Sequence, residues 1–145
     1  MIVEKLVVGF LKTNCYIVYS PDNRGCAVID PGGESRRICA DLEKRGLTPD
    51  VILLTHAHAD HVRGLWHLYE KTGACVYVHA GELDARINIG PFRFVPPPKT
   101  QYVCEGSTIC AGSLRFSVLE CPGHTPGSVV YRCEDTLFTG DTLLH

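Results

Sequence analysis

The sequence predicts an α+β fold in one domain, residues 1–145. Strand-like apolar runs outnumber helix-like segments, and the two predicted helices do not alternate regularly with the strands. That irregular order excludes a doubly wound parallel sheet. A chain of 145 residues, 45% of them hydrophobic, is also long enough to bury a core of its own, since single domains cluster at about 100–150 residues.

The predicted strands occur along the whole chain. Each is a short run rich in apolar and β-branched residues and bounded by Gly, Pro, Asn or Asp. They cover residues 2–10, 14–20, 25–30, 51–55, 74–78, 101–104, 108–111, 114–120, 128–132 and 136–139. The stretch 81–100 contains four prolines, so we expect a long irregular connection there, of the kind that often borders a binding site.

Two segments predict helices. Residues 34–45 have apolar side chains at i, i+4 spacing, with Ser35 as the expected N-cap and Gly46 as the end of the helix. A second helix is expected over about 60–71 and is ended by Gly73.

Composition and charge exclude several classes of protein. The formal net charge is −2 and no basic block is present, so we expect no nucleic-acid partner. No apolar run reaches the roughly 20 residues of a membrane span, so no membrane association is expected. The first residues lack the features of a secretion signal, which predicts a cytoplasmic protein. The eight cysteines include no C-x-x-C pair, so we expect reduced side chains that pack in the core.

The segment T-H-A-H-A-D-H at 55–61 carries the chemistry. Imidazole nitrogen and carboxylate oxygen are ligands suited to zinc, iron and manganese. His56 and His58 are two residues apart, so their rings project to the same side of an extended chain. Asp60 and His61 follow where the chain becomes helical and are directed to a different point. The spacing therefore predicts two neighbouring metal sites.

Two later segments are predicted to complete these sites. C-P-G-H-T-P-G at 121–127 places His124 in a tight turn between two predicted strands. F-T-G-D-T at 138–142 places Asp141 directly after an apolar strand. Each residue alone would be an ordinary turn residue, but beside the first segment each becomes a candidate metal ligand.

Together with V-I-D-P-G at 28–32, these motifs resemble the metallo-β-lactamase superfamily, and their wording is most similar to the glyoxalase II-like (hydroxyacylglutathione hydrolase-related) enzymes. The resemblance implies an αββα sandwich, of which this chain would supply the N-terminal half and the start of the second half. It also implies ligand roles: His56, His58 and His124 for one metal, Asp60 and His61 for the other. Asp141 would bridge the two ions, and Asp30 would hold the ligand loops by hydrogen bonds.

The function implied by the resemblance is metal-dependent hydrolysis of thioesters of the S-acylglutathione type by a metal-bound hydroxide. Asp60 would be the catalytic residue that orients and deprotonates the water. The cofactor is expected to be one or two zinc ions, with iron or manganese as alternatives, and the partner a small-molecule substrate. Two other functions stay open: a persulfide dioxygenase with one iron, and a catalytically weak metal-binding fragment.

Relatives of this type continue beyond the G-D-T motif with further strands, helices and a last histidine ligand. Here only four residues follow Asp141, which predicts an incomplete domain and a second metal site without its last ligand. His145 is the only later histidine and could substitute only poorly. We also expect strand 136–139 to be an uncovered central strand, through which the chain could self-associate.

Overall fold

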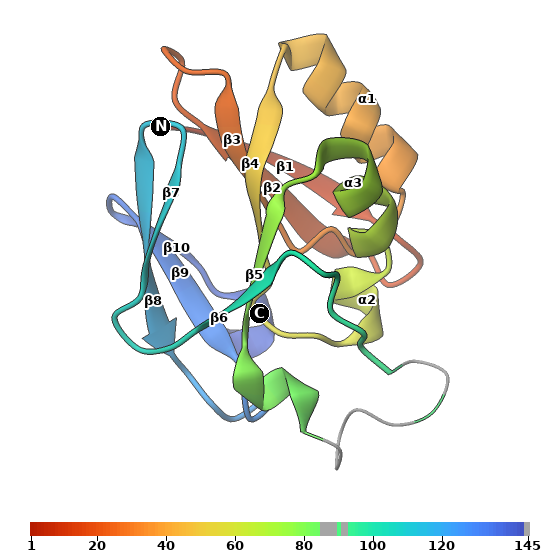
Figure 1. Cartoon of the computed structure of the whole chain (residues 1–145), viewed down its shortest axis with the longest axis vertical. Coiled ribbons are helices and arrows are strands. Elements are labelled where there is room, and N and C mark those ends of the chain that lie inside the picture. Colours follow the sequence, from red (N-terminus) through yellow and green to blue (C-terminus); the bar gives the residue numbers. More distant parts are fainter. Residues whose placement is uncertain (85–89, 91–92, 144–145) are drawn as a thin grey trace.

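The computed structural model describes residues 1–84, 90 and 93–143, which form three layers. A six-stranded sheet lies in the middle, helices cover one of its faces, and a four-stranded sheet covers the other (Figure 1). The α+β class is therefore confirmed. Among the described residues no helix packs on the outer face of the four-stranded sheet, so these are three of the four layers of the expected αββα sandwich.

The six-stranded sheet is mixed and has the order β1-β2-β3-β4-β5-β6. β1, β2 and β3 pair antiparallel, whereas β3 to β6 are parallel. Parallel neighbours bring the carboxyl ends of β3, β4 and β5 to the same edge of the sheet. The strands are β1 (Ile2–Val8), β2 (Thr13–Tyr19), β3 (Gly25–Ile29), β4 (Thr48–Leu53), β5 (Cys75–His79) and β6 (Thr100–Val103).

The four-stranded sheet is an antiparallel meander of order β10-β9-β8-β7. It comprises β7 (Thr108–Ala111), β8 (Leu114–Glu120), β9 (Val129–Cys133) and β10 (Thr136–Phe138). β10 is an edge strand rather than the expected central one, since in the described part of the chain it pairs only with β9. Leu137 is 51% exposed, while Phe138 is buried. Self-association through this edge stays a prediction.

The helices differ from the expected ones in two respects. α1 (Ser35–Arg45) ends before its C-cap Gly46, as predicted, but its N-cap is Glu34 and not the predicted Ser35, which is its first helical residue. The Glu34 carboxylate accepts a hydrogen bond from the Gly9 amide, 2.7 Å away, and makes no side-chain cap.

The predicted helix 60–71 is in fact two helices, α2 (Ala59–Val62) and α3 (Leu65–Thr72). The break lies at Gly64, whose N–H donates to the carbonyl oxygen of Pro31 (2.8 Å). Short 3₁₀ turns, η1 (Ala80–Leu83) and η3 (Gly140–Thr142), follow β5 and β10. The expected irregular connection 81–100 thus begins with a 3₁₀ turn, and part of it lies outside the described residues.

Two apolar cores hold the layers together. Ile38 and Leu42 of α1 and Leu65 and Leu68 of α3 pack on the six-stranded sheet. Between the two sheets, side chains such as Ile29 and Leu53 meet Phe116, Val118 and Tyr131. The six-stranded sheet is therefore apolar on both faces: one face packs against the helices and the other against the four-stranded sheet.

The cysteines are all free thiols. Four of them, Cys15, Cys26, Cys75 and Cys133, are buried, so their predicted packing role is confirmed, whereas Cys104 and Cys110 are exposed. Burial, followed by the charge of Asp50, raises the pKa of Cys26 to about 12. In the described part of the chain, no helix has both the length and the apolar character needed to cross a membrane.

Candidate metal centre

The candidate ligands converge at one edge of the molecule although they come from both sheets. His56 and His58 lie on the loop that follows β4, and Asp60 and His61 lie on α2. His124 belongs to the connection between β8 and β9, and Asp141 to η3 after β10. The Val129 N–H donates to the Thr55 carbonyl oxygen (2.9 Å), which joins the start of β9 to the His56 loop.

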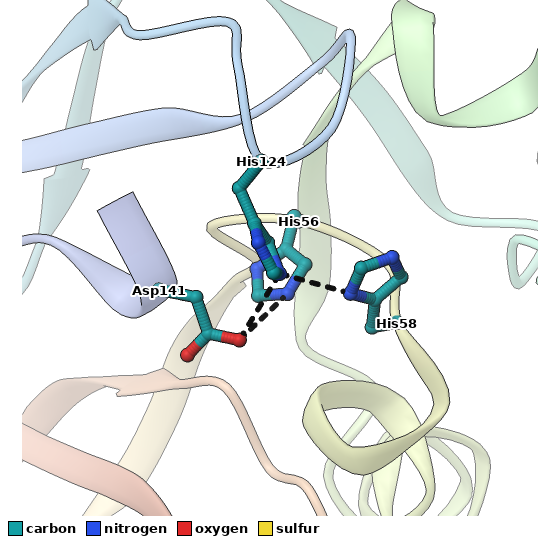
Figure 2. A group of neighbouring side chains, drawn as sticks. All are labelled: His56, His58, His124 and Asp141. Carbon is teal, nitrogen blue, oxygen red and sulfur yellow. Dashed lines mark hydrogen bonds and ion pairs between the residues drawn. The ribbon is translucent and has the colours of Figure 1, made fainter. Parts of the chain in front are cut away.

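The first cluster consists of His56, His58, His124 and Asp141, whose nearest ligand atoms all lie within 4.8 Å of one another. Figure 2 shows the three imidazoles and the carboxylate facing a common point. His124 Nε2 is 3.1 Å from His58 Nδ1 and 3.2 Å from Asp141 Oδ2. His56 Nε2 is 3.5 Å from the same carboxylate oxygen.

The second cluster consists of Asp60, His61 and Asp141. His61 Nε2 lies 3.4 Å from Asp60 Oδ2 and 3.3 Å from Asp141 Oδ1. Asp141 therefore turns one carboxylate oxygen to each cluster, which is the arrangement a bridging ligand needs. Thr13 Oγ1 donates to Asp60 Oδ2 (3.1 Å) and restricts the orientation of that carboxylate.

His56 has the tautomer that a metal ligand requires. Thr55 Oγ1 donates its single hydrogen to Asp30 Oδ2 (2.7 Å), so His56 Nδ1, 3.1 Å from the same hydroxyl, must be the donor there. Nε2 then carries a lone pair, is buried and has no hydrogen-bond partner among the described residues. Burial, reinforced by the positive charge of His61, lowers the pKa of His56 to about 3, which keeps the ring neutral at pH 7.

Asp30 organises the loops behind both clusters. Its Oδ1 accepts from the Thr55 N–H (2.8 Å), and its Oδ2 lies 3.0 Å from His61 Nδ1. Burial disfavours the imidazolium form of His61, but the hydrogen bond to Asp30 and the charges of Asp30, Asp141 and Asp60 outweigh it and raise the His61 pKa to about 9. Asp30 thus holds the Nδ1 hydrogen in place and leaves Nε2 facing the second cluster, as outer partners of metal-ligating histidines do.

The spacing of the ligand atoms fits a metal ion. In tetrahedral sites with metal–nitrogen bonds of about 2.0–2.1 Å, the ligand atoms are about 3.3–3.4 Å apart; three of the separations within the first cluster are 3.1–3.5 Å, and all lie within 4.8 Å. His56 Nε2 and Asp141 Oδ2 are both acceptors, so their approach is unfavourable without a cation between them. The buried, unpartnered nitrogen and the mixed nitrogen and oxygen donor set therefore suit zinc, iron or manganese.

A cavity of about 340 Å³ adjoins the second cluster. Asp60, His61 and Asp141 form one wall, and residues of the β1–β2 hairpin, among them Lys12 and Tyr16, form another. A larger cavity of about 590 Å³ lies between α1 and α3. None of the cluster residues lines it, so the smaller cavity is the candidate substrate site.

Two glycines allow the ligand segments to approach their supports. A Cβ atom at Gly32 would lie 1.8 Å from the Asp60 carbonyl oxygen, and one at Gly140, where φ is +54°, would lie 2.3 Å from Thr55 Oγ1. Both positions therefore require glycine. Any side chain at Gly32 would collide with the backbone of α2, and any side chain at Gly140 would collide with the side chain of Thr55.

We expect Gly32→Ala to push α2 away from the Asp30 loop. The added methyl group cannot be accommodated without backbone movement, and overpacking of this kind costs about 1–3 kcal/mol. Thermal unfolding of the metal-free variant measures the loss of stability. An unchanged unfolding midpoint would contradict the close contact between Gly32 and α2.

The structure brings the predicted ligands together in the two clusters and places Asp30 behind them, and their roles as ligands stay predictions. His145 lies outside the described residues. His79, at the end of β5, pairs with Glu120 (3.0 Å) and belongs to neither cluster. Sequence reasoning missed Glu82, a buried carboxylate on η1 that contacts both histidine loops. The signal in the sequence is limited to its place in the connection 81–100, which is expected to border a binding site.

Comparison with known proteins agrees with the geometry. Residues 8–145 match the family model of the Metallo-beta-lactamase superfamily. The probable metallo-hydrolase YqgX of Bacillus subtilis (strain 168) is 37% identical over 150 residues, which cover 97% of this chain and 70% of that protein. A hydroxyacylglutathione hydrolase of Klebsiella pneumoniae is 36% identical over 132 residues, which cover 91% of this chain and 48% of that enzyme. Both relatives are longer than this chain.

Solved structures show the same fold. The BLEG-1 B3 metallo-beta-lactamase superposes with a TM-score of 0.86 at 31% identity, over 99% of this chain and 74% of that one. TTHA1623 in a di-iron-bound form superposes with a TM-score of 0.80 at 32% identity, again over 99% of this chain and 74% of that one. One similar protein thus binds iron, so the family resemblance does not select a metal.

Proposed function

This chain belongs to the metallo-beta-lactamase superfamily, and from that premise we propose that it is a zinc-dependent hydrolase of thioesters of the S-acylglutathione type. The relationship of this chain to the hydrolases of the superfamily rests on the comparisons. The observation that carries the proposal is the pair of clusters that share Asp141. The similarity to a hydroxyacylglutathione hydrolase supports the thioester substrate.

The residues of the site have separate tasks in this proposal. His56, His58 and His124 with Asp141 would hold one ion, and Asp60 and His61 with Asp141 a second. Ions bound there would lower the pKa of a water molecule and polarise the substrate carbonyl. No side chain acts as a nucleophile.

Asp60 is the residue we expect to handle the proton of the attacking water. Its side chain is 26% exposed and forms part of the cavity wall, so the carboxylate is accessible to a water molecule there. The hydrogen bond from Thr13 Oγ1 occupies Oδ2 and leaves Oδ1 to accept a proton. A thiolate leaving group needs little protonation to depart, which makes thioesters suitable substrates for a site without a second general acid.

The test is an assay of the zinc-loaded protein with an S-acylglutathione thioester, with the oxygen ester of the same acyl group and a chromogenic cephalosporin as comparison substrates. We expect one or two metal ions per chain and hydrolysis of the thioester above that of the other two. Removal of the metal by a chelator should abolish hydrolysis, and its return should restore it. Bound metal without thioester hydrolysis would contradict the proposed substrate.

A persulfide dioxygenase with one iron is the second candidate. The first cluster supports this candidate because its three imidazoles and one carboxylate are enough to hold a single ion. Oxygen consumption by the iron-loaded protein with glutathione persulfide, without thioester hydrolysis, would select this function. Metal binding without either activity would leave the third alternative, a catalytically weak metal-binding fragment.

A further inference from the structure

We propose that Glu82 is a positioning residue that sets the distance between the two histidine loops of the first cluster. This inference rests on the proposed function, because it concerns the metal that the cluster would hold. Glu82 lies on η1, is 2% exposed and is itself no member of either cluster. It acts through the backbone beside the ligands.

The Glu82 carboxylate bridges the loops with one oxygen on each. Oε2 accepts a hydrogen bond from the N–H of Ala57 (3.0 Å), the residue between His56 and His58. Oε1 accepts from the Gly127 N–H (3.1 Å) and from the hydroxyl of Thr125, which directly follows His124. One rigid, planar group therefore fixes the backbone on both sides of the first cluster.

The hydroxyl groups behind Glu82 have defined directions. Thr125 Oγ1 gives its hydrogen to Glu82, so the contact of 2.7 Å between Thr125 Oγ1 and Ser128 Oγ must use the hydrogen of Ser128. Ser128 Oγ in turn accepts from the Thr125 N–H (3.1 Å). Hydrogen bonds among Thr125, Ser128 and the Glu82 carboxylate therefore hold the His124 loop in place.

Two glycines make this contact possible. A Cβ atom at Gly127 would lie 2.8 Å from the Glu82 nitrogen and 2.9 Å from its Oε1. A Cβ atom at Gly81 would lie 3.0 Å from the Gly127 Cα. The backbone of η1 therefore lies directly against the His124 loop, and both glycines are explained by the approach of Glu82.

The consequence for the ligands is a fixed separation. His58 Nδ1 and His124 Nε2 are 3.1 Å apart, although one follows β4 and the other follows β8. Without a metal, one of these ring nitrogens donates to the other. The bonds from Glu82 hold their loops together without a metal, so the site is preorganised for the ion.

The test is Glu82→Gln, which keeps the shape of the side chain but has only one acceptor oxygen. Whichever way the amide turns, its NH₂ group faces a backbone N–H, either that of Ala57 or that of Gly127, so the hydrogen bond to one of the two loops is lost. We expect the affinity for the first metal ion to fall about 10–100-fold, as for other outer partners of metal ligands. Competition with a chelator measures this affinity, and the visible spectrum of the Co²⁺-loaded protein reports the ligand geometry.

Leu68→Ala is the matched control. Leu68 is buried on α3, packs between the helices and the six-stranded sheet, and belongs to neither cluster. This variant should lose thermal stability without metal yet keep the affinity and the Co²⁺ spectrum of the wild type. If Glu82→Gln does not fold, Thr125→Val removes one of the same hydrogen bonds and takes its place.

The outcomes separate the two proposals. A wild-type protein that binds no metal ends both of them. A wild-type protein that binds metal, together with a Glu82→Gln variant of unchanged affinity and spectrum, overturns the role of Glu82 alone, whatever its melting temperature. Weaker binding with an altered spectrum supports it, even if no thioester is hydrolysed.

Discussion

Asp141→Ala is expected to reduce thioester hydrolysis more than about 100-fold and to lower the metal content. Loss of an outer partner of a metal ligand typically costs 10–100-fold in metal affinity or activity, and Asp141 faces both clusters directly. Its two oxygens lie 3.2 Å from His124 Nε2 and 3.3 Å from His61 Nε2. The second cluster would keep only Asp60 and His61, so we expect the second ion to be lost first.

Asp135→Ala controls for the loss of a carboxylate at the opposite end of β10. Asp135 is exposed, lies in the turn between β9 and β10, and is absent from both clusters. Metal analysis of the two variants should show a deficit only for Asp141→Ala. Equal metal content and equal hydrolysis in the Asp141 variant and the wild type would refute the bridging arrangement.

Asp30→Ala is expected to destabilise the metal-free protein by about 3–5 kcal/mol, the cost of removing one partner of a buried ionic pair. Asp30 is 2% exposed and accepts from the Thr55 N–H, the Thr55 hydroxyl and His61 Nδ1. All three donors would be left buried without their acceptor. Urea unfolding of the metal-free protein measures the loss.

Asp30→Asn separates stability from metal binding. The amide oxygen can still accept from Thr55, so we expect a smaller loss of stability than for Asp30→Ala. The amide NH₂ would instead face His61 Nδ1 and favour the tautomer with hydrogen on Nε2, which cannot bind a metal. This variant should therefore lose the second ion. An Asp30→Asn protein that is as unstable as Asp30→Ala but binds both ions would contradict this assignment of hydrogen atoms.

The sequence predicted the parts of this molecule that local spacing determines. The apolar runs located most strands within one or two residues, and H-x-H-x-D-H, His124 and Asp141 were found because their residue types and strand-end positions have direct chemical meaning. The predictions of Ser35 as the N-cap of α1 and of one continuous helix over 60–71 were wrong, since the observed ends depend on contacts between distant segments: Glu34 with Gly9, and Gly64 with Pro31.

Glu82 was missed for a related reason. A single glutamate at the start of a proline-rich connection is usually solvated, and nothing in its neighbours marks it as buried. Only the parallel arrangement of β4 and β5 brings the segment after β5 beside the segment after β4. The identity of the metal and the substrate is not encoded in the ligand pattern, because the same nitrogen and oxygen donors suit several ions.

The candidate ligands come from two sheets, and metal binding by them would link the supply of the ion to folding. His56, His58 and His61 follow the six-stranded sheet, whereas His124 and Asp141 belong to the four-stranded sheet. An ion that needs both sets binds only when the sheets are docked, so it draws the equilibrium toward the docked state. The gain is RT ln(1 + [M]/Kd), about 2.7 kcal/mol when the free ion is at 100 times Kd. A cell that withholds the ion would therefore lower the amount of folded protein as well as the rate of its reaction.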